Sequence, residues 1–300
     1  MAKIWRLLET GYNSGSWNMA VDEAILLSHA RGLVPPTVRL YGWEPPALSI
    51  GHLQSALREV DLEACKRLGI DMVRRPTGGR AVLHDEEVTY SIIIRESDPL
   101  LPKSLQESYS LVAKGIIRGL EALGVKAQIR GPARAQRDRV AGVQMGANAR
   151  ISAEPGRNVE VPRRGDRLSG ACFDSPAWYE IVVDGKKLVG SAQARLSGVF
   201  LQHGSILLSL DVEKQCSVLA FPSERERALA KRSLASRATS LKEILGRDVS
   251  FNEVSMAIIG GIQESLEVEL TPGGLIYEEL ETARELISQK YANDRWNLRR

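Results

Sequence analysis

The chain has few cysteines and histidines, which narrows the chemistry open to it. Only three of its 300 residues are cysteines, and Cys65, Cys172 and Cys216 form neither a CxxC pair nor an even set of the kind that builds a disulfide framework. A reducing cytoplasm is therefore the expected location. The four histidines have no metal-ligand spacing to one another, so we expect no metal site.

Long apolar runs and a strong excess of one charge are also missing. The amino-terminal segment MAKIWRLLETG lacks the apolar run of a signal peptide, and no later stretch approaches the roughly 18 apolar residues of a membrane span. The net charge of +3, from 40 basic and 37 acidic residues, is too small to indicate a nucleic-acid partner. We therefore expect neither a membrane nor a nucleic acid among its partners. The 43% of apolar residues can still form a sizeable core.

The pattern of apolar residues predicts strands interleaved with helices. We expect helices at about 18–30, 61–68, 108–123, 240–246, 251–266 and 277–290, and strands at about 38–41 and 48–50. Asp184-Gly185 and Ser197-Gly198 predict hairpins, and the PTGG and HDEE turns predict further hairpins within residues 71–94. This combination favours an α/β or α+β domain with a mixed sheet.

Residues 131–168 differ in composition from the rest of the chain. They contain eight arginines, five glycines, three prolines and no aromatic residue. Because such a stretch buries little apolar surface, we expect a mobile loop. Two interpretations remain open: a solvated insertion, or a basic surface that steers an acidic protein partner.

Several common catalytic motifs are absent, and the first candidate site is the run RRPTGGRAVLHD at residues 74–85. The chain has no GxxxxGK[ST] loop, GxSxG elbow, HExxH or GxGxxG. Within the run, Gly78 and Gly79 allow close backbone approach to a ligand and present N–H groups to a carbonyl or an anion. Arginines beside them, such as Arg75, carry the charge to hold a phosphate or carboxylate. The alternative is a glycine turn between two strands with solvated arginines.

The second candidate site combines Cys172 with Lys187, fifteen positions later. A nearby cation keeps a cysteine as its nucleophilic thiolate, and an ammonium also stabilises a developing oxyanion. Cys172 directly follows the expected loop and precedes an aromatic strand, which favours access. A lone cysteine is more often a small buried hydrophobe, an interpretation that suits Cys65 and Cys216. Taken alone, these features indicate no more than a cysteine-dependent transferase.

Six blocks of sequence resemble one known family. RRPTGGRAVLHDEEVTYS is similar to the signature of the lipoate and biotin protein ligase superfamily, and DGKKLVGSAQAR and LQHGSILL resemble its lipoate branch. SWNMAVDEAIL, ACFDSPAWYE and KYANDRWN extend the resemblance to the bacterial octanoyltransferases of the Gram-positive type. The likeness runs over nearly the whole chain except residues 131–168.

The resemblance implies a fold and a division of the chain. The expected fold is a biotin/lipoate protein ligase-like catalytic domain, with a mixed sheet and flanking helices, over residues 1–300. Its core is expected at about 33–265, with the arginine-rich insertion at 131–168 and a C-terminal helical segment at about 266–300.

The resemblance also implies an activity and partners. The expected reaction transfers octanoyl from octanoyl-acyl carrier protein to a lysine of a lipoyl-bearing protein, such as the glycine cleavage H protein. This is the first step of lipoyl cofactor biosynthesis. We expect no requirement for ATP, because exchange of one thioester for another is nearly balanced. We also expect a monomer that needs no metal.

The family's functional residues transfer to matching positions. Cys172 is expected to be the nucleophile. Lys187, which Leu188 and Val189 separate from the pair Gly190-Ser191, is expected to lower the pKa of Cys172 and polarise the acyl carbonyl. Lys186 is its misaligned neighbour. Val82, Leu83 and Val189 are candidates to line an acyl tunnel, with core packing as the alternative. The residues expected to bind substrate are Arg75, Gly78, Gly79, His84, Ser191 and His203.

Three other functions remain as alternatives. An ATP-dependent lipoate ligase would typically carry GGGAV where this chain has Gly78-Gly79-Arg80-Ala81-Val82, and it would not require Cys172. An amidotransferase would move octanoyl from one lipoyl protein to another through its own cysteine. A non-catalytic module that binds lipoyl domains would need neither Cys172 nor Lys187.

Overall fold

The structure is a computed structural model in which residues 3–130 and 180–299 are described. The arginine-rich stretch 131–168 and Cys172 lie outside the described residues. The strands are β1 (Lys3–Asn13), β2 (Thr37–Trp43), β3 (Ala47–Ile50), β4 (Asp71–Arg74), β5 (Val82–His84), β6 (Glu87–Arg95), β7 (Gln128–Ile129), β8 (Ile181–Val183), β9 (Lys186–Leu196), β10 (Val199–Leu207) and β11 (Val268–Pro272). The helices are α1 (Gly15–Arg31), α2 (Ala56–Glu59), α3 (Leu62–Arg67), α4 (Leu105–Ala122), α6 (Val212–Ser217), α7 (Glu224–Arg237), α8 (Leu241–Leu245), α9 (Phe251–Leu266), α10 (Tyr277–Leu286), the π-helix η2 (Ile287–Tyr291) and α11 (Asp294–Asn297).

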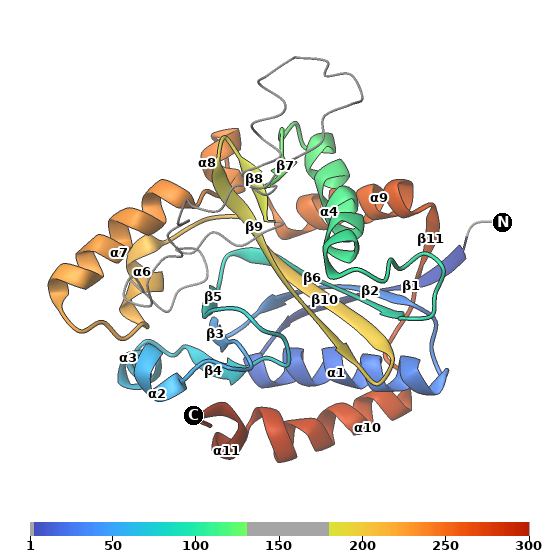
Figure 1. Cartoon of the computed structure of the whole chain (residues 1–300), viewed down its shortest axis with the longest axis horizontal. Helices are drawn as coiled ribbons and strands as arrows, with labels where there is room; N and C mark the ends of the chain where they lie inside the picture. The colour runs from blue at the N-terminus through green and yellow to red at the C-terminus, as the bar shows by residue number, and fades with distance from the viewer. Residues whose placement is uncertain (1–2, 131–179, 300) are drawn as a thin grey trace, which may run out of the picture.

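The described strands form two sheets (Figure 1). The larger has eight strands in the order β11-β1-β2-β6-β10-β9-β8-β7, and the smaller has the order β4-β3-β5. In the larger sheet β1 runs parallel to both β2 and β11, and the remaining neighbours are antiparallel. The predicted α/β architecture with a mixed sheet is therefore confirmed.

Helices cover both faces of the larger sheet. Figure 1 shows α4 and α9 over one face, and α1 with α10 beneath the other. Side chains of β6 alternate between the two sides, because successive residues of a strand point to opposite faces. Ile92 belongs to the apolar core that contains Ile116 of α4 and Ile258 of α9, whereas Ile93 packs with Ala24 of α1.

Both hairpins predicted from a residue followed by glycine are confirmed. Asp184-Gly185 joins β8 to β9, and Ser197-Gly198 joins β9 to β10, each pair antiparallel. All four turn residues have positive φ, between 48° and 78°. This backbone matches the type I′ turn that fits the twist of paired strands, and glycine adopts it without a steric penalty.

The hairpins predicted at PTGG and HDEE are wrong. β4 and β5, on either side of PTGG, do not pair with each other, because β3 lies between them and bonds to both. β5 and β6, on either side of HDEE, belong to different sheets. A tight-turn sequence specifies a local reversal of the chain, and the hydrogen-bonding partner of each strand was decided by a segment more than twenty residues away.

The predicted helices are confirmed, and the unpredicted elements lack a clear periodicity. The stretches expected to be helical correspond to α1, α3, α4, α8, α9 and α10, the last continuing into η2. The sequence pattern did not predict β1, β11, α6 or α7. In α7 only Ala230 and Leu234 are buried, so this helix carries no continuous apolar stripe.

The carboxyl-terminal segment joins the main body of the fold. It opens with β11, which adds to the edge of the larger sheet, before α10 packs against α1 (Figure 1). The extents proposed for the domain, with a core at about 33–265 and a helical segment at about 266–300, stay a prediction. Within residues 3–130 and 180–299, no helix is both long enough and apolar enough to cross a membrane.

Candidate active site

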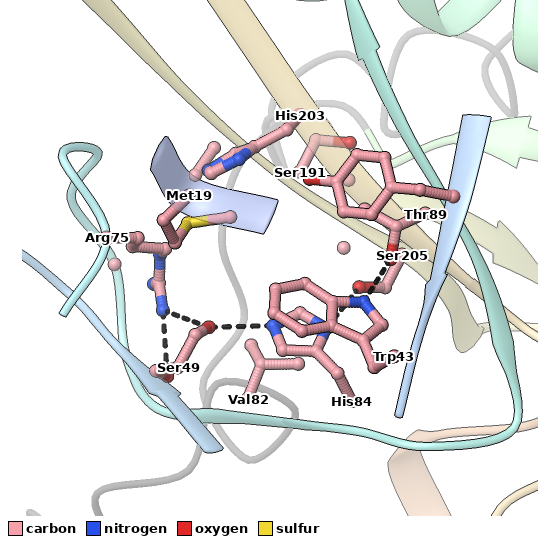
Figure 2. A pocket seen from close by; sticks show the side chains of 15 residues that line it. Met19, Trp43, Ser49, Arg75, Val82, His84, Thr89, Ser191, His203 and Ser205 are labelled. Carbon is pink, nitrogen blue, oxygen red and sulfur yellow. Dashed lines mark hydrogen bonds between the residues drawn. The ribbon is translucent and has the colours of Figure 1, made fainter. Parts of the chain in front are cut away.

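A small cavity of about 50 Å³, partly open to solvent, lies where the two sheets and α1 meet (Figure 2). Segments within residues 19–89 and 190–205 form its wall. The lining residues are Met19, Tyr41, Trp43, Ser49, Arg75, Gly79, Val82, His84, Thr89, Gly190, Ser191, Ala192, His203, Gly204 and Ser205. Small residues on β9 and β10 leave this space open, and a Cβ on Gly204 would lie 2.7 Å from Oγ of Ser191.

His84 is held in the cavity wall from three sides. Its Nε2 lies 2.7 Å from Oγ of Ser49, and its Nδ1 lies 2.7 Å from Oε1 of Glu87. The indole of Trp43 stacks on the imidazole, with ring centroids 4.1 Å apart and planes 12° apart. The ring therefore has a defined orientation, with one nitrogen facing a carboxylate and the other a hydroxyl.

Glu87 is a buried carboxylate whose Oε1 accepts several hydrogen bonds. The hydroxyls of Thr89 and Ser205 donate to this oxygen, which also faces His84. Thr89 in turn accepts from the indole N–H of Trp43 at 2.7 Å. This network keeps the carboxylate in place at the base of the imidazole.

His203 belongs to a second buried network. Its Nε2 lies 2.7 Å from Oγ1 of Thr77, and its Nδ1 lies 3.5 Å from Oδ2 of Asp22. Burial lowers the pKa of His203, and this effect outweighs the attraction of Asp22. Burial alone would raise the pKa of Asp22, but Arg39 and His203 together hold it below its ordinary value. Near neutral pH the pair is therefore a neutral imidazole beside a carboxylate.

Arg75 braces the glycine turn. Its guanidinium donates to the carbonyls of Ser49 at 3.0 Å, Gly78 at 2.8 Å and Arg80 at 2.7 Å. Gly79 has a φ of +97°, and a Cβ on Gly51 would lie only 2.0 Å from the Gly79 carbonyl oxygen. The turn thus needs glycine for contact between backbones. Gly79 borders the cavity, whereas Gly78 is exposed and is not among the lining residues.

The interpretation of Arg74 and Arg75 as solvated arginines is wrong. Their exposed fractions are 0% and 4%. Arg74 donates to the carbonyls of Gly51 at 3.0 Å, Asn297 at 3.0 Å and Arg299 at 2.7 Å. Both guanidiniums therefore act as hydrogen-bond centres for buried backbone.

Lys187 is a buried cation on β9. Its ammonium lies 2.6 Å from Oε1 of Glu180, and both side chains are less than 5% exposed. Arg130 also approaches this carboxylate, at 3.6 Å. Lys186, by contrast, forms a surface ion pair with Glu243 at 2.7 Å. The two lysines thus differ in burial, and their roles in the reaction stay predictions.

The cysteines and the apolar candidates divide as follows. Cys65 and Cys216 are buried, and burial raises the pKa of the Cys65 thiol to about 11, so it is an unreactive core thiol. Val82 borders the cavity, while Leu83 and Val189 pack in the apolar cores.

The structure gathers most of the expected substrate-binding residues around one cavity. Arg75, Gly79, His84, Ser191 and His203 all border it. The sequence analysis missed Ser49, Glu87 and Asp22, which hold the two imidazoles. Asp22 lies in the helix expected at 18–30 and Glu87 in the HDEE turn, but nothing in the local pattern linked either carboxylate to a histidine.

The site roles, the position of Cys172 and the absence of a cofactor stay predictions. Among residues 3–130 and 180–299, no group of three or more His, Cys, Asp or Glu side chains has the geometry to hold a metal ion. The arrangement offers an apolar space, two oriented imidazoles and a buried ammonium nearby, which suits handling of an acyl carbonyl.

Comparison with known proteins identifies the family. Residues 14–263 match the model of the lipoyl protein ligase A/B catalytic domain. The chain therefore belongs to this family. Among solved structures, a bipartite lipoate protein ligase from Thermoplasma acidophilum superposes with a TM-score of 0.73 and 26% identity, over 100% of this chain and 98% of that one. Lipoate-protein ligase A bound with ATP gives 0.71 and 27%, over 99% of both chains.

Relatives that match from end to end narrow the class within the family. Octanoyltransferase LipM of Kyrpidia tusciae is 50% identical over 298 residues, which cover 99% of this chain and 100% of the relative. Octanoyltransferase LipM of Bacillus subtilis is 39% identical over 99% of both chains. The protein is accordingly an acyltransferase of this family, and the expected kinship with the octanoyltransferases is confirmed.

Proposed function

We propose that the protein carries an octanoyl group on Cys172 and transfers it to a lysine of a lipoyl-bearing protein. Octanoyl-acyl carrier protein is the donor, and the glycine cleavage H protein or another lipoyl domain is the acceptor. The octanoyltransferase relatives support the acyl group and the type of reaction. The archaeal ligase, described together with its E2 lipoyl domain, supports the class of acceptor.

The buried cation close to the cavity is the observation that carries this proposal. Lys187 is 3% exposed at its side chain and lies on the same strand as Gly190 of the cavity wall. Three residues of strand span roughly 10 Å. Cys172 precedes Glu180, the partner of Lys187, by eight positions in the sequence. An ammonium in this neighbourhood lowers the pKa of a thiol and stabilises the oxyanion formed on its acyl group.

The cavity provides a place for the acyl chain. Met19, Trp43, Val82 and Ala192 give its wall an apolar surface. Burial of each methylene of an octanoyl chain contributes about 0.8 kcal/mol, so a chain of this length gains several kcal/mol from such a wall. The imidazole of His84 gives the same wall a polar group that can face the acyl carbonyl.

The reaction proceeds in two half-reactions with a covalent intermediate. The Cys172 thiolate attacks the thioester carbonyl of octanoyl-phosphopantetheine, and the carrier thiol leaves. One thioester replaces another, so this half-reaction is nearly balanced and needs no ATP. The lysine amine of the acceptor then attacks the Cys172 thioester, and formation of an amide makes this half-reaction downhill.

Trapping the acyl-enzyme tests the proposal. We expect intact-mass measurement after incubation with octanoyl-acyl carrier protein to show one octanoyl adduct, released by hydroxylamine and mapped to Cys172. Cys172→Ala should lose the adduct and reduce transfer to an apo lipoyl domain by about 100-fold or more. Cys65→Ala and Cys216→Ala remove buried thiols, and these variants should keep both the octanoyl adduct and the transfer activity. Full transfer by Cys172→Ala would contradict the proposal.

A second candidate is ATP-dependent ligation of free lipoate. The relation to lipoate-protein ligase A bound with ATP favours it. Modification of a lipoyl domain with free lipoate and ATP, unaffected by Cys172→Ala, would establish this function. Use of an octanoylated H protein as the donor in the same assay would instead identify an amidotransferase.

A further inference from the structure

Ser49, His84 and Glu87 form a hydrogen-bonded series at the cavity, and Figure 2 shows the part of it between Ser49 and His84. Ser49 Oγ lies 2.7 Å from Nε2 of His84, whose Nδ1 lies 2.7 Å from Oε1 of Glu87. Their exposed fractions are 1%, 7% and 1%, and Ser49 and His84 border the cavity. A hydroxyl, an imidazole and a carboxylate joined in this order form the arrangement with which hydrolases activate a serine.

The surrounding hydrogen bonds set the direction of proton transfer in this series. The hydroxyls of Thr89 and Ser205 donate to Oε1 of Glu87, as expected for a carboxylate, which only accepts. Nδ1 of His84 then donates to the same oxygen, and Nε2 is left to accept the proton of Ser49. Trp43, stacked on the imidazole, restricts its rotation.

Arg75 places a positive charge beside the serine. Its Nη1 donates to Oγ of Ser49 at 3.1 Å. A buried guanidinium at this distance stabilises the negative charge that develops on the oxygen when its proton leaves. Octanoyl transfer through Cys172 and Lys187 leaves the Ser49 hydroxyl without a role.

We propose that Ser49 is a second nucleophile of this protein, and that Ser49, His84 and Glu87 hydrolyse medium-chain acyl thioesters whose chain enters the cavity. The inference rests on the proposed function only in assigning an acyl chain to this cavity. It does not require Cys172.

The chemistry uses the acyl thioester and water alone. Ser49 Oγ bonds to the acyl carbonyl carbon while its proton moves to Nε2 of His84. The carbon–sulfur bond breaks, and the departing thiol takes that proton. Water then attacks the Ser49 ester and gives a proton to His84, which returns it to Oγ as the ester bond breaks. The products are a free medium-chain carboxylic acid and a thiol.

The experiment uses the full-length Cys172→Ala protein, so that no acyl group can pass through that thiol. We expect diisopropyl fluorophosphate to label Ser49, as mapped by peptide mass spectrometry. We also expect this protein to hydrolyse octanoyl-pantetheine. The thiol that the reaction releases measures its rate. Adding Ser49→Ala should abolish the label and slow hydrolysis by about 100-fold or more.

Ser255→Ala is the matched control, because Ser255 of α9 is also a fully buried serine but is not among the residues that line the cavity. It should keep the label on Ser49. Absence of a label on Ser49 in protein that melts at the wild-type temperature would overturn the inference, as would a label on another residue or unchanged hydrolysis in the Ser49→Ala protein. Because Cys172 is absent throughout, failure of the acyl-cysteine proposal would leave these outcomes unaffected.

Discussion

Two ion pairs near the cavity illustrate how this protein buries charge. Asp22 lies 2.7 Å from Arg39, with both side chains 0% exposed, and Glu180 lies 2.6 Å from Lys187. Removing one partner of such a pair leaves a buried charge and typically costs about 3–5 kcal/mol. At the residue scale these pairs place charge close to the cavity. Substitution of either partner is therefore expected to destabilise the fold.

In the proposed mechanism Lys187 is the cation that polarises the acyl carbonyl, so Lys187→Met should lower octanoyl transfer by about 100-fold or more. It should also shift the pH profile of Cys172 alkylation by iodoacetamide to higher pH, because the thiol loses a neighbouring positive charge. A purely structural role of Lys187 would leave that profile in place. Transfer kinetics and alkylation rates across pH measure both effects.

Lys186→Met provides the matched control one residue away. Lys186 is 37% exposed at its side chain and pairs with Glu243 on the surface. Removing this pair should change the free energy of unfolding by less than about 1 kcal/mol and leave transfer intact. Equal losses in the two variants would contradict the separate roles given to these lysines.

At the scale of elements, α4 and α9 cross with their backbones in contact. A Cβ on Gly119 of α4 would lie 2.6 Å from the carbonyl oxygen of Ala257. A Cβ on Gly261 of α9 would lie 2.2 Å from the backbone nitrogen of Gly119. The close crossing lets Ile116 and Ile258 bury themselves in the same apolar core over the sheet.

Gly261→Ala should destabilise the protein by about 1–3 kcal/mol or more, because the added methyl group cannot fit between the helices. At Gly260, its neighbour on α9, a Cβ would meet no atom within 4 Å, so Gly260→Ala should be neutral or stabilise by up to about 1 kcal/mol through helix propensity. Urea unfolding of both variants measures the difference. Similar stabilities would show that the helices separate easily.

At the scale of the whole molecule, the carboxyl-terminal segment packs against elements from the first third of the chain. Arg74, next to the glycine turn, donates to carbonyls of Asn297 and Arg299. Lys290 and Tyr291 both bond to Glu23 of α1. The carboxyl-terminal helices thereby support two segments that line the cavity, and the stability of the site depends on the complete fold.

Acidification should weaken the whole fold through its buried histidines. Burial lowers the pKa values of His29 and His203 from 6.5, so below that pH the unfolded chain binds protons that the folded chain does not. The free energy of unfolding should therefore fall as pH drops below 6.5, by up to about 1.4 kcal/mol per pH unit for each histidine. His203→Gln should reduce this slope in urea unfolding. An equal slope in His203→Gln and in the wild type would contradict a lowered pKa of His203 in the folded protein.

Much of the local structure was predictable from the sequence because its causes are local. The spacing of Val112, Ile116 and Leu120 defined a helical face, and the pairs at 184–185 and 197–198 marked turns that need positive φ. The run RRPTGGRAVLHD, singled out by its resemblance to a known family, also contributes residues to the cavity wall. Each of these features depends on residues that lie close together in the sequence.

Which side chains meet was decided by the tertiary structure alone. Ser49 reaches His84 because β3 pairs with β5, and His203 reaches Asp22 because β10 and α1 lie on one side of the cavity. Arg75 looks like a surface cation in the sequence, yet the fold buries it among carbonyls. Partners so distant along the chain leave no periodic signal, since strand pairing and burial depend on the packing of the whole molecule. The sequence by itself determined the longer helices, the two hairpins with glycine turns and the resemblance to a family; the tertiary structure determined the strand partners, the two imidazole networks and the burial of Lys187.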